Sequence, residues 1–430
     1  MKKLWFKRLS ASLFLVIVLF FGIKYHLFSC LTMPNETILF VGDQLEIPKG
    51  VRENTAIEVS AHSVLEKAKT KWTAKREGQT DMLLSIGGFP IKKMSVRVLS
   101  DFTVIPGGQS IGIRMHTKGV LVVGFHTVQT SKGRVSPAEQ SGIRIGDTIT
   151  HINGSRVEKM EDLRPFIVES GQNGQALFLT VLRKNEQVKC KLQPVQEKNQ
   201  SQFKMGLYIR DRAAGIGTLT FYHPTTMKYG ALGHMISDVD TGEPILVESG
   251  EIVRSTVNSI QRGKEGTPGE KLASFQSQAT KIGEVQKNTP YGVYGELTEG
   301  MKNHIIDKGI PIALSAQVHK GKAQILTVVE NEKVEAFDVE IVRSIPQKNA
   351  ATKGLVLKIV DERLLKKTGG IVQGMSGSPI IQDGKLIGAV THVFVNDPTM
   401  GYGVHVEWML KEAGIDIYGN KASIRLETAS

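Results

Sequence analysis

The sequence has few cysteines, the residues that cross-link small exported proteins through disulfides. Only two of its 430 residues are cysteines, Cys30 and Cys190. They fall in different regions, so a disulfide framework is not the basis of stability. No His-Glu-x-x-His or paired Cys-x-x-Cys pattern occurs, which disfavours a metallopeptidase. We therefore predict no metal site and no other cofactor.

Aromatic residues are also scarce, at 6%, whereas 44 glycines and 15 prolines punctuate many short Val/Ile-rich runs. This composition is typical of β-rich domains. A chain of 430 residues is too long for one hydrophobic core, so we expect two or three folded domains of a mainly β class. The formal charge of +12 is scattered among acidic residues without a recurring aromatic-basic platform. We therefore predict no nucleic-acid partner and only a weak attraction to anionic membranes.

Residues 1–30 predict a signal anchor or transmembrane segment. Four basic residues within the first eight precede an uncharged run from Leu9 to Ile23, and Lys24 can snorkel to extend the span toward Phe28. No small-x-small cleavage site follows cleanly, so we expect an uncleaved anchor with the remaining chain exported. Lipoprotein processing at Cys30 and a buried core helix remain alternatives.

Residues 35–100 predict a small β-rich region. The runs 37–41, 56–59 and 94–98 alternate apolar and polar residues and are separated by Gly and Pro turns. No chemical motif falls in this region, which we interpret as a spacer or a partner surface.

Residues 101–196 carry a second pattern. The segment 141–147 is typical of a helix end closed by Gly142, with a turn at Gly146, and Asn153-Gly154 predicts a tight hairpin after the next strand. Residues 163–170 predict a helix, and 176–182 the closing strand. This succession resembles a PDZ domain.

The PDZ resemblance implies a peptide ligand. The family binds a peptide carboxylate in a loop where successive backbone N–H groups form a nest, and the next strand pairs with the peptide. The sequence in that place reads Ser110, Ile111, Gly112 and Ile113. The alternative interpretation is that Gly112 is only a turn glycine.

The strongest chemical signal is the hexapeptide Gly374-Met-Ser-Gly-Ser-Pro379. A nucleophilic serine needs a sharp turn that exposes its hydroxyl while backbone N–H groups converge on the developing oxyanion. Glycines flanking Ser376 permit that turn. We predict Ser376 as the nucleophile and the amides of Gly374 and Ser376 as the oxyanion donors.

This element resembles the trypsin and HtrA serine proteases, in which it precedes a β-hairpin that binds substrate. The resemblance implies a trypsin-like double β-barrel peptidase domain over residues 200–430. It also implies substrate contacts from Thr391, in the second hairpin strand, and from Tyr402, in a later strand that would wall the specificity pocket.

A serine hydroxyl needs a base to remove its proton. We predict His234, which follows a strand at 217–222 and is flanked by small residues. His223 and His392 are the competing candidates. A Ser/Lys dyad that uses Lys366 or Lys367 remains possible on chemical grounds.

The acid that would orient the histidine has the weakest local signal. We predict Asp361, which ends the apolar strand 355–360. It lies close before Ser376, whereas ordinary trypsin-like chains place the acid nearer the midpoint between histidine and serine. Asp238 and Asp240 are the alternatives.

The basic anchor, the PDZ pattern and the order His234, Asp361, Ser376 together resemble the stage IV sporulation protein B peptidases of endospore-forming bacteria. The resemblance spans essentially the full length and supports these three residues. It implies export from the forespore into the space between the two membranes, with the anchor in the forespore membrane. Self-cleavage there and cleavage of a membrane-associated regulator would then lead to sigma-factor activation. The rival hypothesis is a PDZ scaffold with a catalytically inactive protease-like domain.

Overall fold

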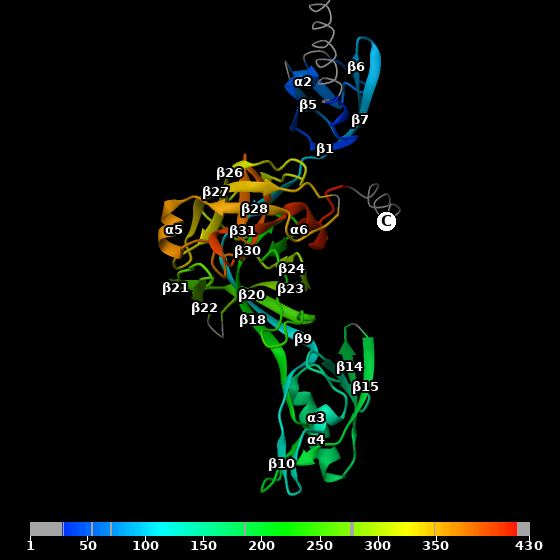
Figure 1. Ribbon diagram of the computed structural model, residues 1–430, viewed down its shortest axis with the longest axis vertical. Coiled ribbons are helices and arrows are strands. Elements are labelled where there is room, and N and C mark those ends of the chain that lie inside the picture. Colours follow the sequence, from blue (N-terminus) through cyan, green and yellow to red (C-terminus); the bar gives the residue numbers. More distant parts are fainter. Residues whose placement is uncertain are drawn as a thin grey trace, which may run out of the picture. The chain divides into compact units, whose positions relative to one another are not determined.

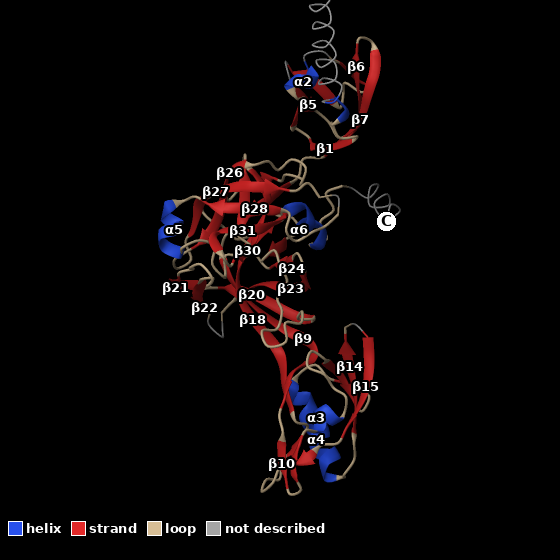
Figure 2. Cartoon of the chain, in the orientation of Figure 1, coloured by secondary structure: helices blue, strands red, loops and turns tan. Residues whose placement is uncertain are grey.

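The computed structural model describes residue 28 and residues 30–52, 55–68, 71–184, 186–275, 279–347 and 349–418. Strands dominate this part of the chain and helices are short (Figure 2), so the mainly β class is confirmed. The predicted N-terminal anchor lies outside the described residues, apart from its last few positions. No described helix is both long and apolar enough to cross a bilayer.

The first compact unit extends to Phe102. It holds a four-stranded sheet in the order β1-β7-β6-β3, in which only the β1–β7 pair is parallel, and a three-stranded sheet in the order β2-β5-β4. The elements are β1 (Glu36–Phe40), β2 (Gln44–Glu46), α2 (Lys49–Arg52), β3 (Ala56–Val59), β4 (Leu65–Ala68), β5 (Lys71–Ala74), β6 (Gly78–Ile86) and β7 (Phe89–Leu99).

The second unit runs from Thr103 to Asp416 and contains the PDZ pattern. The predicted turns are present: Gly142 and Gly146 have φ of +78° and +91°, and Asn153 and Gly154 have φ of +49° and +85°. The elements are β10 (Val128–Thr130), β11 (Gly133–Val135), α3 (Pro137–Gln140), β12 (Thr148–Ile152), β13 (Ser155–Arg156), η1 (Met160–Asp162), α4 (Leu163–Gln172), β14 (Leu177–Arg183), β15 (Glu186–Leu192), β16 (Val195–Gln196) and β17 (Phe203–Lys204).

Two long strands belong to both the PDZ part and the peptidase part (Figure 1). The first half of β9 pairs with the second half of β18, and the two strands pair again beyond a break in register between Arg210 and Arg212. Gly119, with φ of +94°, marks the break on β9. The PDZ part is therefore joined to the peptidase by continuous strands. These strands are β9 (Ser110–Phe125) and β18 (Leu207–Tyr222).

The first barrel is a closed ring of six antiparallel strands in the order β9-β20-β23-β24-β19-β18, because β9 also pairs with β18. A short hairpin, β21–β22, projects from it. The additional elements are β8 (Thr103–Pro106), β19 (Lys228–Ala231), β20 (Val247–Arg254), β21 (Thr256–Gln261), β22 (Glu270–Ser274), β23 (Lys281–Thr289) and β24 (Gly292–Leu297).

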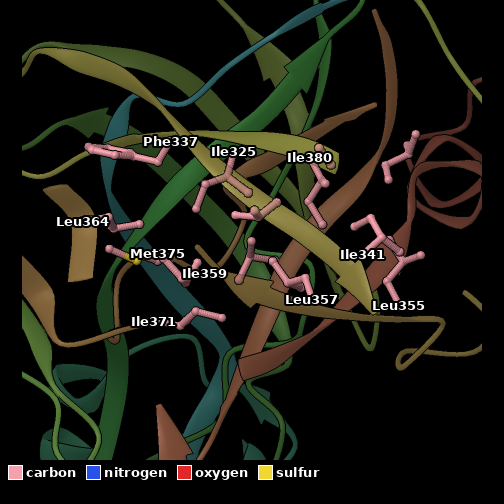
Figure 3. Close-up of a cluster of buried hydrophobic side chains, with 14 of the residues drawn as sticks. Ile325, Phe337, Ile341, Leu355, Leu357, Ile359, Leu364, Ile371, Met375 and Ile380 are labelled. Carbon is pink, nitrogen blue, oxygen red and sulfur yellow. The ribbon is translucent and has the colours of Figure 1, made fainter. Parts of the chain in front are cut away.

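The second barrel is closed in the order β26-β27-β28-β31-β30-β29. Alternation along β27 turns Phe337, Val339 and Ile341 inward, where they pack with other buried aliphatic side chains (Figure 3). The barrel strands are β26 (Gly321–Val328), β27 (Val334–Ser344), β28 (Leu355–Ile359), β29 (Pro379–Gln382), β30 (Lys385–Phe394) and β31 (Asp397–His405). The remaining elements are α5 (Glu362–Thr368), α6 (Val406–Glu412) and β25 (Ile310–Pro311), which pairs with β8.

Candidate active site

The predicted nucleophile Ser376 lies on a sharp turn between α5 and β29. Gly374 and Gly377 have φ of +88° and +93° there, a region that glycine adopts without strain. A Cβ at Gly377 would lie 2.1 Å from the Thr218 carbonyl oxygen. The neighbouring Met375 side chain is fully buried in the core of the second barrel (Figure 3). Ser376 itself is only half-buried.

The serine turn is held by the first barrel, although the second barrel carries it. On β18, the Thr218 amide donates to the Ser376 carbonyl at 2.9 Å, and the Thr218 hydroxyl donates to the Gly374 carbonyl at 2.8 Å. The Thr220 hydroxyl donates to the Gly377 carbonyl at 2.7 Å. Both threonines are fully buried. The turn is therefore fixed in an environment where water does not compete for these bonds.

The two predicted oxyanion donors have a defined direction. In a trans peptide the C=O group and the following N–H point opposite ways. The Gln373 carbonyl accepts from the Lys271 amide at 2.9 Å, and the Met375 carbonyl accepts from the Ser378 amide at 2.9 Å. These bonds orient the amides of Gly374 and Ser376, neither of which has an acceptor within the described parts of the chain. Both N–H groups are therefore available to a substrate oxygen.

His234, the predicted base, lies beside this turn. It follows β19 in a loop where Leu232 N would be 2.4 Å from a Cβ added to Gly377, and Thr391 Cγ2 would be 2.8 Å from one added to Gly233. Burial lowers the pKa of His234, so the imidazole is neutral at neutral pH and able to accept a proton.

The resting hydrogen bonds define the tautomer of His234. Its Nδ1 lies 2.7 Å from the Met235 carbonyl oxygen. A carbonyl only accepts, so Nδ1 carries the proton and Nε2 is the free base. The Ser376 hydroxyl donates to the Thr391 carbonyl at 2.7 Å, and no hydrogen bond between Ser376 and His234 is present. The Ser376 side chain must therefore rotate toward the imidazole before proton transfer.

The competing histidines occupy different places. His392 is exposed on β30, with its ring centroid 4.9 Å from that of His234. His223 lies at the end of the β18–β19 hairpin, where its Nδ1 accepts from the Thr226 amide at 3.2 Å. The structure therefore brings His234 and His392, but not His223, to the serine turn.

Asp361, the predicted acid, lies at the N-terminus of α5. Its carboxylate caps α5 by accepting from the amides of Arg363 and Leu364, and it pairs with the Arg363 guanidinium at 2.8 Å. The hydrogen bond from Arg363 is the main reason that its pKa is lowered. No contact in the described structure joins it to His234. In this structure the carboxylate that follows the apolar strand acts as a helix N-cap.

The two alternative candidates for the catalytic acid, Asp238 and Asp240, also make bonds to groups other than His234. Asp238 is buried, and its carboxylate accepts from the amides of Asp240 and Thr241 and pairs with Arg210. Asp240 pairs with the same arginine at 2.7 Å. Lys366 and Lys367, the candidates for a Ser/Lys dyad, are exposed on α5.

The replacement Asp361→Asn tests the capping role. Asparagine caps helices about as well as aspartate, so the free energy of unfolding should fall by less than ~1.5 kcal/mol, chiefly from the lost ion pair. The rate at which a fluorophosphonate labels Ser376 should stay within about threefold of the original. A hundredfold loss in a folded variant would instead return Asp361 to the catalytic machinery.

The two predicted substrate contacts lie on adjacent strands near the serine. Thr391 is 2% exposed, and its carbonyl accepts the Ser376 hydroxyl while its own hydroxyl is buried without a partner. Tyr402 packs against Phe394, with ring centroids 4.6 Å apart. These two rings help to line a surface pocket of ≈ 340 Å³ at the β30–β31 hairpin, together with Val393, Val395, Asn396 and Asp397.

The predicted carboxylate-binding loop is contradicted by the structure. Ser110, Ile111, Gly112 and Ile113 are buried in the first half of β9. This segment pairs with β18 on one side and with β20 on the other. A Cβ on Gly112 would lie 2.4 Å from the Phe275 ring. Because both backbone edges of this segment already pair with strands of the first barrel, neither edge is open to a peptide.

A different segment of the PDZ part has an open edge. Residues 207–210 of β18 pair with β9 on one side, and no described strand pairs with their other side. The preceding Gly206 has φ of +76°, and Phe203 packs on Gly171 of α4. The pattern Met205-Gly206-Leu207 is another apolar-Gly-apolar signal, and it lies beyond the predicted end of the PDZ domain at residue 196.

Lys271 is a buried cation that no sequence pattern indicated. Its side chain is 2% exposed and runs beneath Gly374, and its Nζ donates to the Thr327 hydroxyl at 2.9 Å. Burial lowers the pKa of Lys271 to about 7. The ammonium therefore carries a desolvation cost next to the oxyanion donors.

Replacing this lysine should stabilise the fold. Between pH 7 and the ordinary lysine pKa of 10.5, the unfolded chain binds more protons than the folded one, so the stability of the original protein should rise with pH. Lys271→Met should raise the free energy of unfolding at pH 7 by about 2–4 kcal/mol. The substitution should also reduce the increase of stability with pH, as measured by denaturant unfolding at several pH values. A destabilised variant with the same pH slope would show that the amine is not desolvated.

Family comparisons agree with this architecture. Residues 200–410 match the SpoIVB peptidase S55 family, and residues 110–193 match the PDZ domain family. No curated protein matches the chain. One matching solved structure is an inactive serine-to-alanine mutant of Rv3671c from M. tuberculosis H37Rv, with 13% identity, 46% of this chain and 82% of that chain covered, and a TM-score of 0.25. That similarity is too low to support an argument.

The barrel pair, the glycine-flanked serine and the family match define a serine peptidase that carries a PDZ domain. Within that class, the chain is a SpoIVB-type peptidase of the S55 family.

Proposed function

We propose that this protein is an exported, membrane-anchored serine endopeptidase that cleaves itself and a membrane-associated regulatory protein during sporulation. It would act in the space between the forespore and mother-cell membranes, and cleavage of the regulator would trigger sigma-factor activation in the other compartment. The family match and the basic, apolar N-terminal sequence support this proposal.

The observation that carries the catalytic part is the serine turn. The turn carries two oriented amides and the half-buried Ser376 hydroxyl, and a neutral histidine with a free Nε2 lies beside it. In the proposed mechanism, Nε2 of His234 removes the proton as Ser376 Oγ attacks the peptide carbonyl. The amides of Gly374 and Ser376 stabilise the oxyanion, and the imidazolium then protonates the leaving amine.

Self-cleavage provides the direct test. The full chain in detergent should shorten on a gel, whereas Ser376→Ala and His234→Ala should persist intact, because each loses a group that the acylation step requires. A fluorescent fluorophosphonate should label only chains that retain Ser376. Circular dichroism checks that each variant is folded.

An original chain that neither shortens nor takes up the fluorophosphonate would favour the inactive-scaffold hypothesis. Activity that survives His234→Ala would instead favour a lysine base.

We also propose that the PDZ part binds a peptide by strand addition at residues 207–210 of β18, beside α4. The open backbone edge and the exposed Tyr208 support this site. The same strand carries Arg210, which pairs with Asp238 and Asp240 in the loop that follows His234. A ligand on this edge would therefore act on a strand that is tied to the catalytic histidine.

Arg210→Ala tests that connection. The variant leaves the buried Asp238 without its cation, which should loosen the loop after His234 and slow fluorophosphonate labelling about three- to thirtyfold. Arg212→Ala is the matched control, because Arg212 is exposed on the same strand and only approaches Asp211 at 3.6 Å. Equal labelling rates for both variants would argue against coupling through Arg210.

A further inference from the structure

The loop that carries the histidine is closed by one asparagine. We call residues 233–245 the histidine loop. Asn288, on β23, accepts from the Ile236 amide through Oδ1 at 2.8 Å. Its Nδ2 donates to the Ile236 carbonyl at 2.8 Å and to the Ile245 carbonyl at 3.0 Å. The amide thus joins both ends of the loop to a barrel strand.

The first of these bonds acts on the peptide unit that contacts the histidine. The Ile236 N–H and the Met235 C=O belong to the same planar peptide and point in opposite directions. When Asn288 Oδ1 holds the N–H, it directs the carbonyl away from β23. That carbonyl is the group that lies 2.7 Å from His234 Nδ1.

The supporting strand is part of the barrel sheet. β23 pairs with β20 over residues 281–284 and with β24 over residues 283–289, where Asn288 faces Val293. The Ile245 amide also donates to the Ile236 carbonyl at 3.1 Å. The histidine loop is therefore tied to the β23–β24 ladder next to the peptide that contacts His234.

We propose that Asn288 is a positioning residue that sets the tautomer and direction of His234 through the Met235–Ile236 peptide. This inference rests on the proposed role of His234 as the base. In the resting structure this carbonyl accepts from Nδ1 and so keeps the proton there, which leaves Nε2 as the free base.

The proposal predicts a change in rate and a change in pH dependence. The Met235 carbonyl raises the pKa of His234, against the larger effect of burial, because it stabilises the imidazolium. In Asn288→Ala this contact is loosened. In a plot of labelling rate against pH, the acidic limb should therefore move to lower pH. The limiting rate constant of fluorophosphonate labelling, kinact, should fall roughly 10–100-fold, while the concentration of reagent that gives half this rate, KI, should stay within about twofold.

Two further variants sharpen the test on the full chain. Asn288→Asp keeps the acceptor but places a carboxylate oxygen against two carbonyls, so its kinact should be no higher than that of Asn288→Ala. Asn258→Ala is the matched control: it removes an exposed asparagine on β21 that donates to the Ser274 hydroxyl at 2.9 Å. It should leave both kinact and the acidic limb unchanged.

The outcomes distinguish a failure of the role proposed for Asn288 from a failure of the proposed peptidase function. If Ser376→Ala abolishes labelling but Asn288→Ala keeps the original kinact and acidic limb, the role of Asn288 is overturned and the peptidase assignment stands. A variant that loses kinact only in proportion to its unfolded fraction, with an unmoved limb, would also overturn it. If the original chain does not label at all, the proposed function itself fails.

Discussion

The reactive turn depends on hydrogen bonds from a strand of the other barrel. Thr218 and Thr220 hold three carbonyls of the segment 374–377 from β18, and this segment carries the hydroxyl and both amides of the candidate site. Neither barrel alone could shape the turn, because one supplies the glycines and the other supplies the donors. Relative movement of the barrels would therefore disturb the oxyanion donors before it disturbed either core.

Much of the architecture can be predicted from local signals in the sequence. The serine turn, the PDZ hairpin at Asn153 and the helix predicted at 163–170, which ends at Gln172 in the structure, follow from glycine positions and periodicity, because each depends on contacts within a few residues. The pattern Ser110–Ile113 was misassigned for the opposite reason. An apolar-Gly-apolar run suits a binding loop or a crowded barrel strand equally well, and only the distant partners β18 and β20 distinguish them.

The groups that contact the candidate site also show that local patterns do not reveal contacts between distant parts of the chain. An aspartate before a helix is an N-cap by its local chemistry, and Asp361 makes those bonds. Asn288 and Lys271 lie far from the motifs in sequence and reach the site through strands β23 and β22. Single residues on barrel strands have no flanking pattern, so sequence reasoning could not connect them to the serine or the histidine. The membrane segment remains a prediction from composition.

Strands β9 and β18 are antiparallel neighbours where they leave the first barrel, with His116 opposite Arg212. Every residue of the PDZ part lies between these two positions in the chain. In topological terms the module stands where a barrel hairpin would have its turn, and the two ends of the insertion are one strand spacing apart, roughly 5 Å. A single deletion closed by a two-residue turn would therefore restore an ordinary hairpin. It would leave the barrel connectivity, and the threonines that hold the serine turn, untouched.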